Sequence, residues 1–173
     1  MACLAIGALV LVGTSVVVSN GGSGRASATP RPFHGPVQIE KSSHGKVTST
    51  NWSGYAVTYA SGGNLFSTVS GSWAVPAVSC PNKPQESAFW VGIDGFQSTS
   101  TTVEQVGTDS DCVKGTKKHP GGPSYYAWWE LYPSPTITIP TSNYPVVPGD
   151  TINAEVSRSG STYTLSIADP NQD

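Results

Sequence analysis

The sequence predicts an all-β protein, an antiparallel two-sheet β-sandwich of the lectin-like kind. Two observations of composition favour this class. Only 12% of the residues are charged, and the chain holds 19 glycines and 14 prolines, which is typical of many short strands joined by turns. The third observation is periodicity, because apolar residues alternate over short runs and no 11-residue window carries a helical repeat. The length of 173 residues suits one domain.

The chain begins with an apolar run, "CLAIGALVLVGTSVVV", followed by small residues and "ASA" at positions 26–28. This pattern predicts a signal peptide over residues 1–28 with a cleavage site at its end. No basic residue precedes the run, so we expect either that the true start lies upstream or that the signal is atypical. A permanent membrane anchor is the alternative reading, but the run is marginal in length for a membrane span. We therefore expect a secreted protein without stable membrane association.

Residues 29–46, "TPRPFHGPVQIEKSSHGK", contain three prolines, four charged residues and no periodicity. They are predicted to be a propeptide or a linker. The first 46 residues carry four basic side chains and one acidic one, whereas residues 47–173 carry five basic and ten acidic ones. A basic propeptide is thus expected to associate with the acidic body, with an unstructured tail as the alternative. The same acidic body argues against a nucleic-acid partner, and a monomer is expected.

From Asn51 onward the chain is a series of alternating runs broken by Gly, Pro and Asn. The runs "NWSGYAVTYA" (51–60) and "LFSTVSGSWAVP" (65–76) are joined by "SGGN" and predict a β-hairpin. The next two runs, "SAFWVGIDG" (87–95) and "TTVEQVGTD" (101–109), predict one strand each. These elements and those that follow would together form residues 47–173 into the sandwich domain.

The stretch "SYYAWWELYP" (124–133) concentrates aromatic side chains around a single acid. Read as a strand, it separates into two faces by parity. One face resembles an aromatic groove that contains the acid: Tyr126, Trp128, Glu130 and Tyr132. The other face is predicted to join the core: Tyr125, Ala127, Trp129 and Leu131.

Two elements follow the aromatic strand. The short run "TITI" (136–139) predicts one strand, and "DTINAEVSRSGSTYTLSIAD" (150–169) predicts a hairpin that turns at Ser159–Gly160. Three apolar residues are in phase along the second arm of this hairpin: Tyr163, Leu165 and Ile167.

Three cysteines occur, and Cys3 would leave with the signal peptide. In an exported protein the remaining pair, Cys80 and Cys112, predicts a disulfide, which would stabilise the domain by roughly 3–4 kcal/mol. Metal binding is a poor alternative, because residues 47–173 contain one histidine, His119, and neither a CxxC nor an HExxH spacing. No metal is expected in the site.

Acids and amides on strands remain as candidates for chemistry, since no GxSxG motif occurs. Asp94 and Glu130 lie on strand faces that also carry aromatic rings, and Gln105 lies on a strand between them. A buried carboxylate needs a hydrogen-bond partner, so the two acids are expected to pair with each other or with an amide. A carboxyl and an amide together can orient a water molecule and polarise a carbonyl. Parity alone does not separate such a catalytic groove from a structural network.

The order and spacing of six segments resemble the glutamic peptidases of the eqolisin type (peptidase family G1, formerly grouped as A4). The resemblance runs from Asn51 to about Asp169, and the combination of segments is specific although each one alone is weak. The segments are "NWSGYAV", "SGSWAVP", "FWVGIDG", "EQVGTD", "YYAWWELYP" and "VVPGDTI". The resemblance implies a secreted acid endopeptidase with a β-sandwich fold, a propeptide, no metal cofactor, and proteins or peptides as substrates.

The resemblance also implies roles for individual residues. Gln105 matches the catalytic glutamine, which holds the nucleophilic water and donates to the developing oxyanion. The catalytic glutamate belongs to a segment of the kind "AEWIxE", which matches no residue of this chain and is expected to lie beyond Asp173. The chain is therefore expected to be C-terminally incomplete and inactive as printed. Asp94 and Glu130 would be supporting acids. Four aromatic residues would line the substrate cleft: Trp52, Trp90, Trp128 and Tyr132.

One residue departs from the family pattern, and two other functions stay open. Glu104 stands before the glutamine where better-known members carry an apolar residue, so strand register or packing is expected to differ there. A carbohydrate-binding, lectin-like sandwich is the alternative function, with Trp90, Trp128 and Tyr132 stacking on sugar rings. A structural remnant without activity is the third reading.

Overall fold

The computed structural model describes residues 15–19, 34–43, 46–58, 66–81, 83–97, 99–118 and 120–172. Within these residues all regular structure is β-strand, and no helix is long and apolar enough to cross a membrane. The all-β prediction is confirmed. The strands are β1 (Ser15–Ser19), β2 (Ile39–Ser43), β3 (Lys46–Ser49), β4 (Thr68–Ala74), β5 (Ala88–Asp94), β6 (Val103–Val113), β7 (Gly122–Tyr132), β8 (Ile137–Thr138), β9 (Thr151–Ser159) and β10 (Thr162–Ala168).

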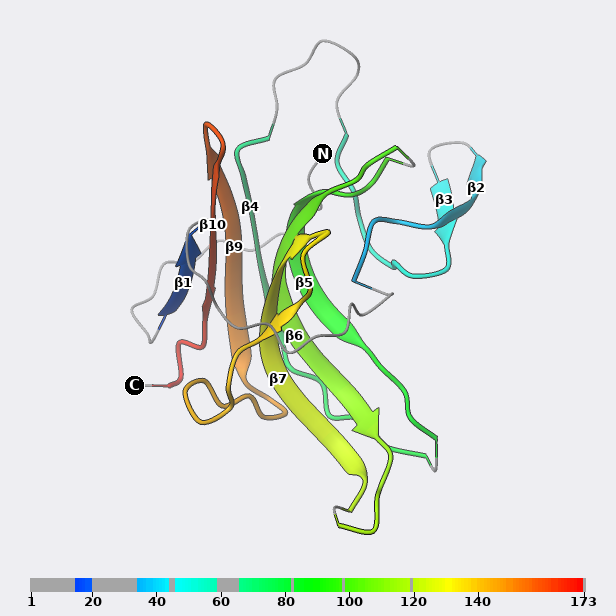
Figure 1. The fold of residues 1–173 in the computed structure, drawn as a ribbon, viewed down its shortest axis with the longest axis vertical. Helices are drawn as coiled ribbons and strands as arrows, with labels where there is room; N and C mark the ends of the chain where they lie inside the picture. Colours follow the sequence, from blue (N-terminus) through cyan, green and yellow to red (C-terminus); the bar gives the residue numbers. More distant parts are fainter. Residues whose placement is uncertain are drawn as a thin grey trace.

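Two antiparallel sheets face each other, as the sandwich prediction requires (Figure 1). One sheet has the strand order β5-β6-β7-β8, and the other has the order β1-β10-β9-β4. Strands β2 and β3 form a separate hairpin beside β5 (Figure 1). The two long central strands β6 and β7 pair over their whole length, so residues on them are held in fixed register.

The core lies between the two sheets and is built from alternate residues of their strands. On β7 the inward side chains are Tyr125, Ala127, Trp129 and Leu131, as parity predicts. The opposite sheet contributes side chains that are 0–1% exposed: Val69, Ile152, Val156, Leu165 and Ile167. Burial of alternate side chains on one face is what fixes the register of each strand. The outward face of β6 and β7 is therefore free to carry a site.

Two sequence predictions for the β elements need correction. Residues 51–58 form no strand of the predicted first hairpin, apart from an isolated bridge at Val57, because Asn51 and Trp52 instead bind the backbone of a preceding segment; residues 59–65 lie outside the described part. The last hairpin is confirmed, but Ser159 pairs with Thr162, which moves the turn by one position to Gly160–Ser161.

The N-terminal part of the chain is more ordered than a linker in the residues that the structure describes. Residues 34–38 lie against the outward face of the sheet, where Val37 donates to the carbonyl of Gly95 at 2.9 Å. The following residues form the β2–β3 hairpin. Strand β1, which lies within the predicted signal peptide, pairs with β10. Removal of the signal peptide and of the propeptide stays a prediction.

The predicted disulfide between Cys80 and Cys112 is confirmed. Cys80 follows β4 of one sheet, whereas Cys112 lies near the end of β6 in the other. Beside the bridge, the backbone of Gln85 exchanges two hydrogen bonds with that of Cys112, at 3.1 and 2.8 Å. The disulfide thus fastens the connection between the two sheets to β6, one of the two longest strands among the described residues.

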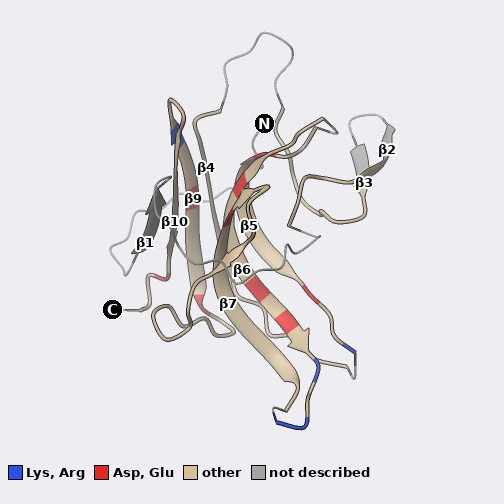
Figure 2. Ribbon diagram, in the orientation of Figure 1, with Lys and Arg blue, Asp and Glu red and all other residues tan. Residues whose placement is uncertain are grey.

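Charged residues are distributed unevenly over the described part of the chain (Figure 2). Most of the described acidic residues lie within strands, and three of them, Glu104, Asp109 and Asp111, are buried on β6. The lysines that the figure colours lie in loops before β5 and after β6. Arg158 of β9 is the exception among the described basic residues, because its charge partly opposes the burial that raises the pKa of Glu104.

Candidate active site

The register of three strands brings the predicted glutamine and one predicted acid together. Gln105 of β6 pairs with Gly92 of β5 on one side and with Glu130 of β7 on the other. Paired residues of antiparallel strands point to the same face, so Gln105 and Glu130 lie side by side on the outward face. Their exposed fractions are 0% and 1%. Residues of the N-terminal segment lie over this pair, and the groove expected from parity stays a prediction.

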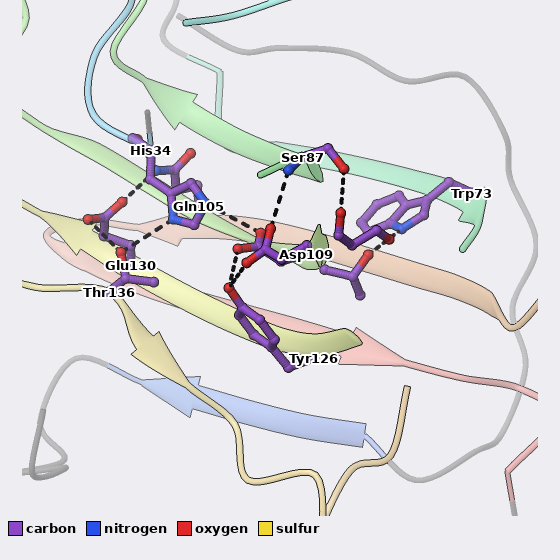
Figure 3. A network of polar contacts seen from close by, with 11 residues as sticks. His34, Trp73, Ser87, Gln105, Asp109, Tyr126, Glu130 and Thr136 are labelled. Atoms are coloured by element: carbon purple, nitrogen blue, oxygen red, sulfur yellow. Dashed lines mark hydrogen bonds and ion pairs between the residues drawn. The ribbon is translucent and has the colours of Figure 1, made fainter. Parts of the chain in front are cut away.

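The side-chain amide of Gln105 has two acceptors. Its nitrogen Nε2 donates to Glu130 Oε2 at 2.6 Å and also to the backbone carbonyl of His34 (Figure 3). Because both partners are acceptors, the network assigns the nitrogen to this side of the amide. The other amide atom, Oε1, is buried and has no hydrogen-bond partner among the described residues. Gln105 therefore presents a donor to a peptide carbonyl and keeps a buried acceptor beside it.

Both carboxylate oxygens of Glu130 accept a hydrogen bond. Thr136, which follows β7, donates its hydroxyl proton to Oε1 at 3.0 Å, and Gln105 donates to Oε2. Burial raises the pKa of Glu130, while these two hydrogen bonds and the nearby His34 act in the opposite direction. Sequence reasoning expected a pairing with either another acid or an amide, and the partner is the amide.

The predicted catalytic glutamate has no counterpart in the described residues. The family resemblance puts it beyond Asp173, whereas the structure describes the chain as far as Gln172. Asp173 and anything after it therefore lie outside the described part, and the position of that glutamate stays a prediction. The acid that contacts Gln105 in the structure is Glu130, to which the resemblance gives only a supporting role.

A second polar cluster lies further along the same face of β6. Tyr126 donates to Asp109 Oδ2 at 2.5 Å and to Asp111 Oδ2 at 2.7 Å (Figure 3). Burial, with both carboxylates adding to it, raises the pKa of Tyr126 above its usual range. The tyrosine thus remains a neutral donor that holds two buried carboxylates together.

His34 joins the two clusters and lies over the face of Trp128. The imidazole and indole rings stack with their centroids 3.9 Å apart at 16°. His34 Nδ1 is 3.3 Å from Thr136 Oγ1, and Nε2 is 3.4 Å from Asp109 Oδ1. The imidazole is 2% exposed. The residue that covers the candidate site is therefore part of its hydrogen-bond network.

The four predicted cleft aromatics do not form one continuous wall. Trp128 is fully buried under His34. Trp52 and Trp90 contact each other edge to face, with centroids 4.7 Å apart at 66°. Tyr132 is half-buried at the end of β7, opposite Val103. Trp128 and Tyr132 thus flank Glu130 along β7, whereas Trp90 lies on β5 and Trp52 lies in no strand.

The side chain of Asp94, the other predicted supporting acid, contacts the opposite sheet instead of Gln105. Asp94 ends β5 with a φ of 68°, in the left-handed region that a non-glycine residue seldom adopts. There it accepts a hydrogen bond from Tyr163 of β10 at 3.5 Å, and its charge raises the pKa of Glu104. The left-handed backbone breaks the alternation on which the sequence prediction relied.

Sequence reasoning missed four residues of the network: His34, Asp109, Tyr126 as a donor, and Thr136. Alternation from Gln105 through Gly107 could have found Asp109 on the same face. Thr136 and His34 lie outside the long strands, so no periodicity marks them. In the described residues no group of three or more His, Cys, Asp or Glu side chains could hold a metal ion.

The fold is an antiparallel β-sandwich, and its site is a buried glutamine–glutamate pair, Gln105 and Glu130. The amide of this pair also binds a main-chain carbonyl. These features define a class of β-sandwich proteins with an amide–carboxylate site. The model of the Peptidase A4 family matches residues 50–173. The chain belongs to this family of glutamic peptidases, so it is of the peptidase type and its substrates are proteins or peptides. No curated protein and no solved structure matches the chain significantly.

Proposed function

We propose that this protein is a secreted endopeptidase that works in acid through Gln105 and a glutamate. One observation carries the proposal: the buried amide of Gln105 donates to the main-chain carbonyl of His34. A main-chain carbonyl is the group that a peptide substrate presents for attack. The site therefore already binds the functional group on which a peptidase acts.

In the proposed reaction a water molecule attacks the scissile carbonyl carbon. The N–H group of Gln105 donates to the oxygen as it becomes negative, and Oε1 of the same amide accepts from the attacking water. The general base is the glutamate that the family resemblance assigns to an "AEWIxE"-like segment. It takes the proton of the water and then delivers it to the leaving amine as the C–N bond breaks.

Glu130 is proposed to support this reaction rather than to replace the base. Its carboxyl group holds the amide of Gln105 at 2.6 Å and is itself held by Thr136. Such an arrangement fixes the direction in which the amide donates. Accepting from Gln105 also directs one oxygen of Glu130 at the amide instead of at a substrate.

Two features support the proposed surroundings. The disulfide between Cys80 and Cys112 suits an oxidising, extracellular compartment. A glutamate that must first accept and later donate a proton works best near carboxyl pKa values, which favours acid. The raised pKa values of Glu104 and Glu130 make the folded protein bind protons readily as the pH falls.

The test compares the printed chain with the same chain extended beyond Asp173 by the family's glutamate-bearing segment, using a denatured protein substrate over a range of acid to neutral pH. The printed chain should show only background cleavage, and the extended chain should cleave with its optimum in acid. Gln105→Ala in the extended chain should lose activity roughly a hundred- to a thousandfold, since one preorganised oxyanion donor is worth about 2.7–4 kcal/mol.

Glu130→Gln is the matched variant and should lose less than Gln105→Ala, with folding of both checked by circular dichroism. Cleavage by the printed chain that Glu130→Gln abolishes would place the catalytic acid on β7 and overturn the assignment. An optimum at neutral pH would contradict the acid mechanism. The carbohydrate-binding alternative is less well supported, because the family model that matches the chain is that of a peptidase family.

A further inference from the structure

The N-terminal segment lies over the site, and its main chain presents the carbonyl of His34 to the amide of Gln105. If Gln105 polarises the scissile carbonyl, as proposed above, then His34 occupies the position of the residue on the N-terminal side of the cleaved bond. The surroundings of the His34 side chain thus describe the subsite for that residue.

The surroundings specify both the shape and the polarity of the side chain. Trp128 provides a flat wall at 3.9 Å, which selects a planar ring. At one edge Thr136 uses its single proton to donate to Glu130, so its oxygen accepts from Nδ1 of the ring. At the other edge the carboxylate of Asp109 lies 3.4 Å from Nε2. A ring with nitrogen at both edges fits these partners.

Other side chains would satisfy only part of this subsite. A phenyl ring could stack on Trp128 but would place C–H groups against a buried carboxylate and a hydroxyl, and leaving such groups without a partner is costly. A lysine could reach Asp109 but has no planar surface for Trp128. An imidazole presents one nitrogen to each edge and stacks on the indole.

We infer that Trp128, Asp109 and Thr136 form a side-chain subsite for histidine beside Gln105, and that His34 fills it and blocks the site in the intact chain. Calling these contacts a substrate subsite rests on the proposed function. The inference does not depend on catalysis for its test, because an imidazole ring can be offered to the subsite as a separate molecule.

The segment is held by contacts other than the imidazole, so the ring can be removed without releasing the backbone. Trp52 Nε1 donates to the carbonyl of Gly35 at 3.0 Å, and Asn51 Nδ2 donates to that of Pro36 at 3.0 Å. Val37 is fixed by its hydrogen bond to Gly95. The variant His34→Ala of the full chain should therefore keep its fold and gain a ring-sized cavity lined by Trp128, Thr136 and Asp109.

The experiment measures the thermal midpoint of this variant with imidazole and with thiazole, a five-membered aromatic ring without an N–H group. Imidazole at tens of millimolar should raise the midpoint of His34→Ala by several degrees, consistent with a Kd of about 1–10 mM for so small a ligand. Thiazole should raise it less, and the unchanged chain should respond to neither. Asp109→Asn combined with His34→Ala should weaken imidazole binding about tenfold.

Equal effects of imidazole and thiazole, or an equal response of the unchanged chain, would overturn the histidine subsite. If His34→Ala fails to fold, the ring protons of His34 in the unchanged chain give a second measurement. Stacking on Trp128 should shift them upfield in the NMR spectrum relative to those of the unfolded chain, and their absence from the shifted region would equally refute the inference. Neither readout needs cleavage, so failure of the proposed function would be recognised separately.

A substrate measurement completes the test in the extended, active chain. Peptides with histidine on the N-terminal side of the cleaved bond should be cleaved at least about tenfold faster than those with alanine there, as expected when a site built to hydrogen-bond a group rejects a substrate that lacks it. Activity without this preference would leave the peptidase assignment standing and remove the subsite.

Discussion

At the scale of single residues, the site depends on how buried polar atoms are satisfied. Gln105 and Glu130 are almost fully buried, and a carboxylate in such a place is stable only when hydrogen bonds offset its lost hydration. Glu130 has both oxygens bonded, and its pKa still lies above the ordinary value because burial outweighs those bonds. Glu130 therefore binds a proton more readily than a glutamate in water does.

Tyr126 offers a prediction at this scale. Its hydroxyl donates to two buried carboxylates, Asp109 and Asp111, so Tyr126→Phe removes a donor from both. We expect the free energy of unfolding at pH 7 to fall by about 2–3 kcal/mol, the range for hydrogen bonds to charged groups. Urea unfolding measures the loss.

Tyr55→Phe is the matched control, since the Tyr55 side chain is 79% exposed and should change stability little. A loss in Tyr126→Phe no larger than that in the control would contradict the role of the hydroxyl as a buried donor.

At the scale of elements, strand β6 is the unusual one, because its residues are buried on both faces up to Cys112. One face contacts the core, and the other carries the amide and the buried acids. Two glycines allow the second face to pack. A Cβ atom on Gly107 would lie 2.3 Å from the carbonyl oxygen of Phe89, and one on Gly92 would lie 3.0 Å from Cβ of Gln105. The absence of side chains there leaves room for Trp90 and for the amide of Gln105.

Elements with strong alternation were predictable from the sequence, and the remainder depended on tertiary contacts. The two faces of β7 and the pairing of β9 with β10 follow from period-two burial. Residues 51–58 carried the same alternation, yet they form no strand because Asn51 and Trp52 bind the segment around Gly35 and Pro36 instead. The role of His34 has no local pattern, since it arises from a contact across 71 residues of sequence.

Glu104 was expected to disturb β6, but the register with β5 and β7 runs through it without a shift. Its side chain is instead buried between the sheets at 7% exposure. Burial raises the pKa of Glu104 from 4.5 to about 7, and the charge of Asp94 adds to this. The departure from the family pattern thus affects protonation and leaves the strand geometry unchanged.

The raised pKa of Glu104 predicts how stability depends on pH. A carboxyl group whose pKa is higher in the folded than in the unfolded state stabilises the fold below about pH 4.5, and this stabilisation is lost as the pH rises through about 7. Between pH 4.5 and 8 the unchanged chain should therefore lose roughly 2–3 kcal/mol of unfolding free energy through this residue.

Glu104→Gln should remove that part of the pH dependence and should be more stable than the unchanged chain at pH 8. Urea unfolding at pH 4.5, 6 and 8 gives the comparison, with Glu155→Gln on the exposed face of β9 as the matched control. Parallel pH curves for Glu104→Gln and the unchanged chain would show that Glu104 ionises at its ordinary value.

At the scale of the whole molecule, a few specific links join the sheets beyond the apolar core. Trp73 of β4 donates its indole N–H to Thr108 of β6 at 2.9 Å, and Tyr163 of β10 reaches Asp94 of β5. The disulfide adds a covalent link between the chain that leaves β4 and the end of β6. The sheet that carries Gln105 is thus tied to the opposite sheet at several points along its length.

The disulfide gives the prediction at this scale. Cys80 and Cys112 are separated by 32 residues, and closing a loop of that size restricts the unfolded chain much more than the folded one. Cys80→Ala combined with Cys112→Ala should lower the free energy of unfolding by about 3–4 kcal/mol in the chain-entropy description. A domain of this size has about 5–15 kcal/mol in total, so the variant should remain folded under mild conditions.

The same description requires two further results. The urea dependence of the unfolding free energy should become steeper in the double variant, because its unfolded chain exposes more surface without the cross-link. A reducing agent should destabilise the unchanged chain by a similar amount and leave the variant unaffected. The upfield NMR shift of the His34 ring should persist in the variant, since the link acts mainly on the unfolded state. Loss of that shift together with the disulfide would show that the bridge also holds the folded geometry of β6, and that the entropic account is incomplete.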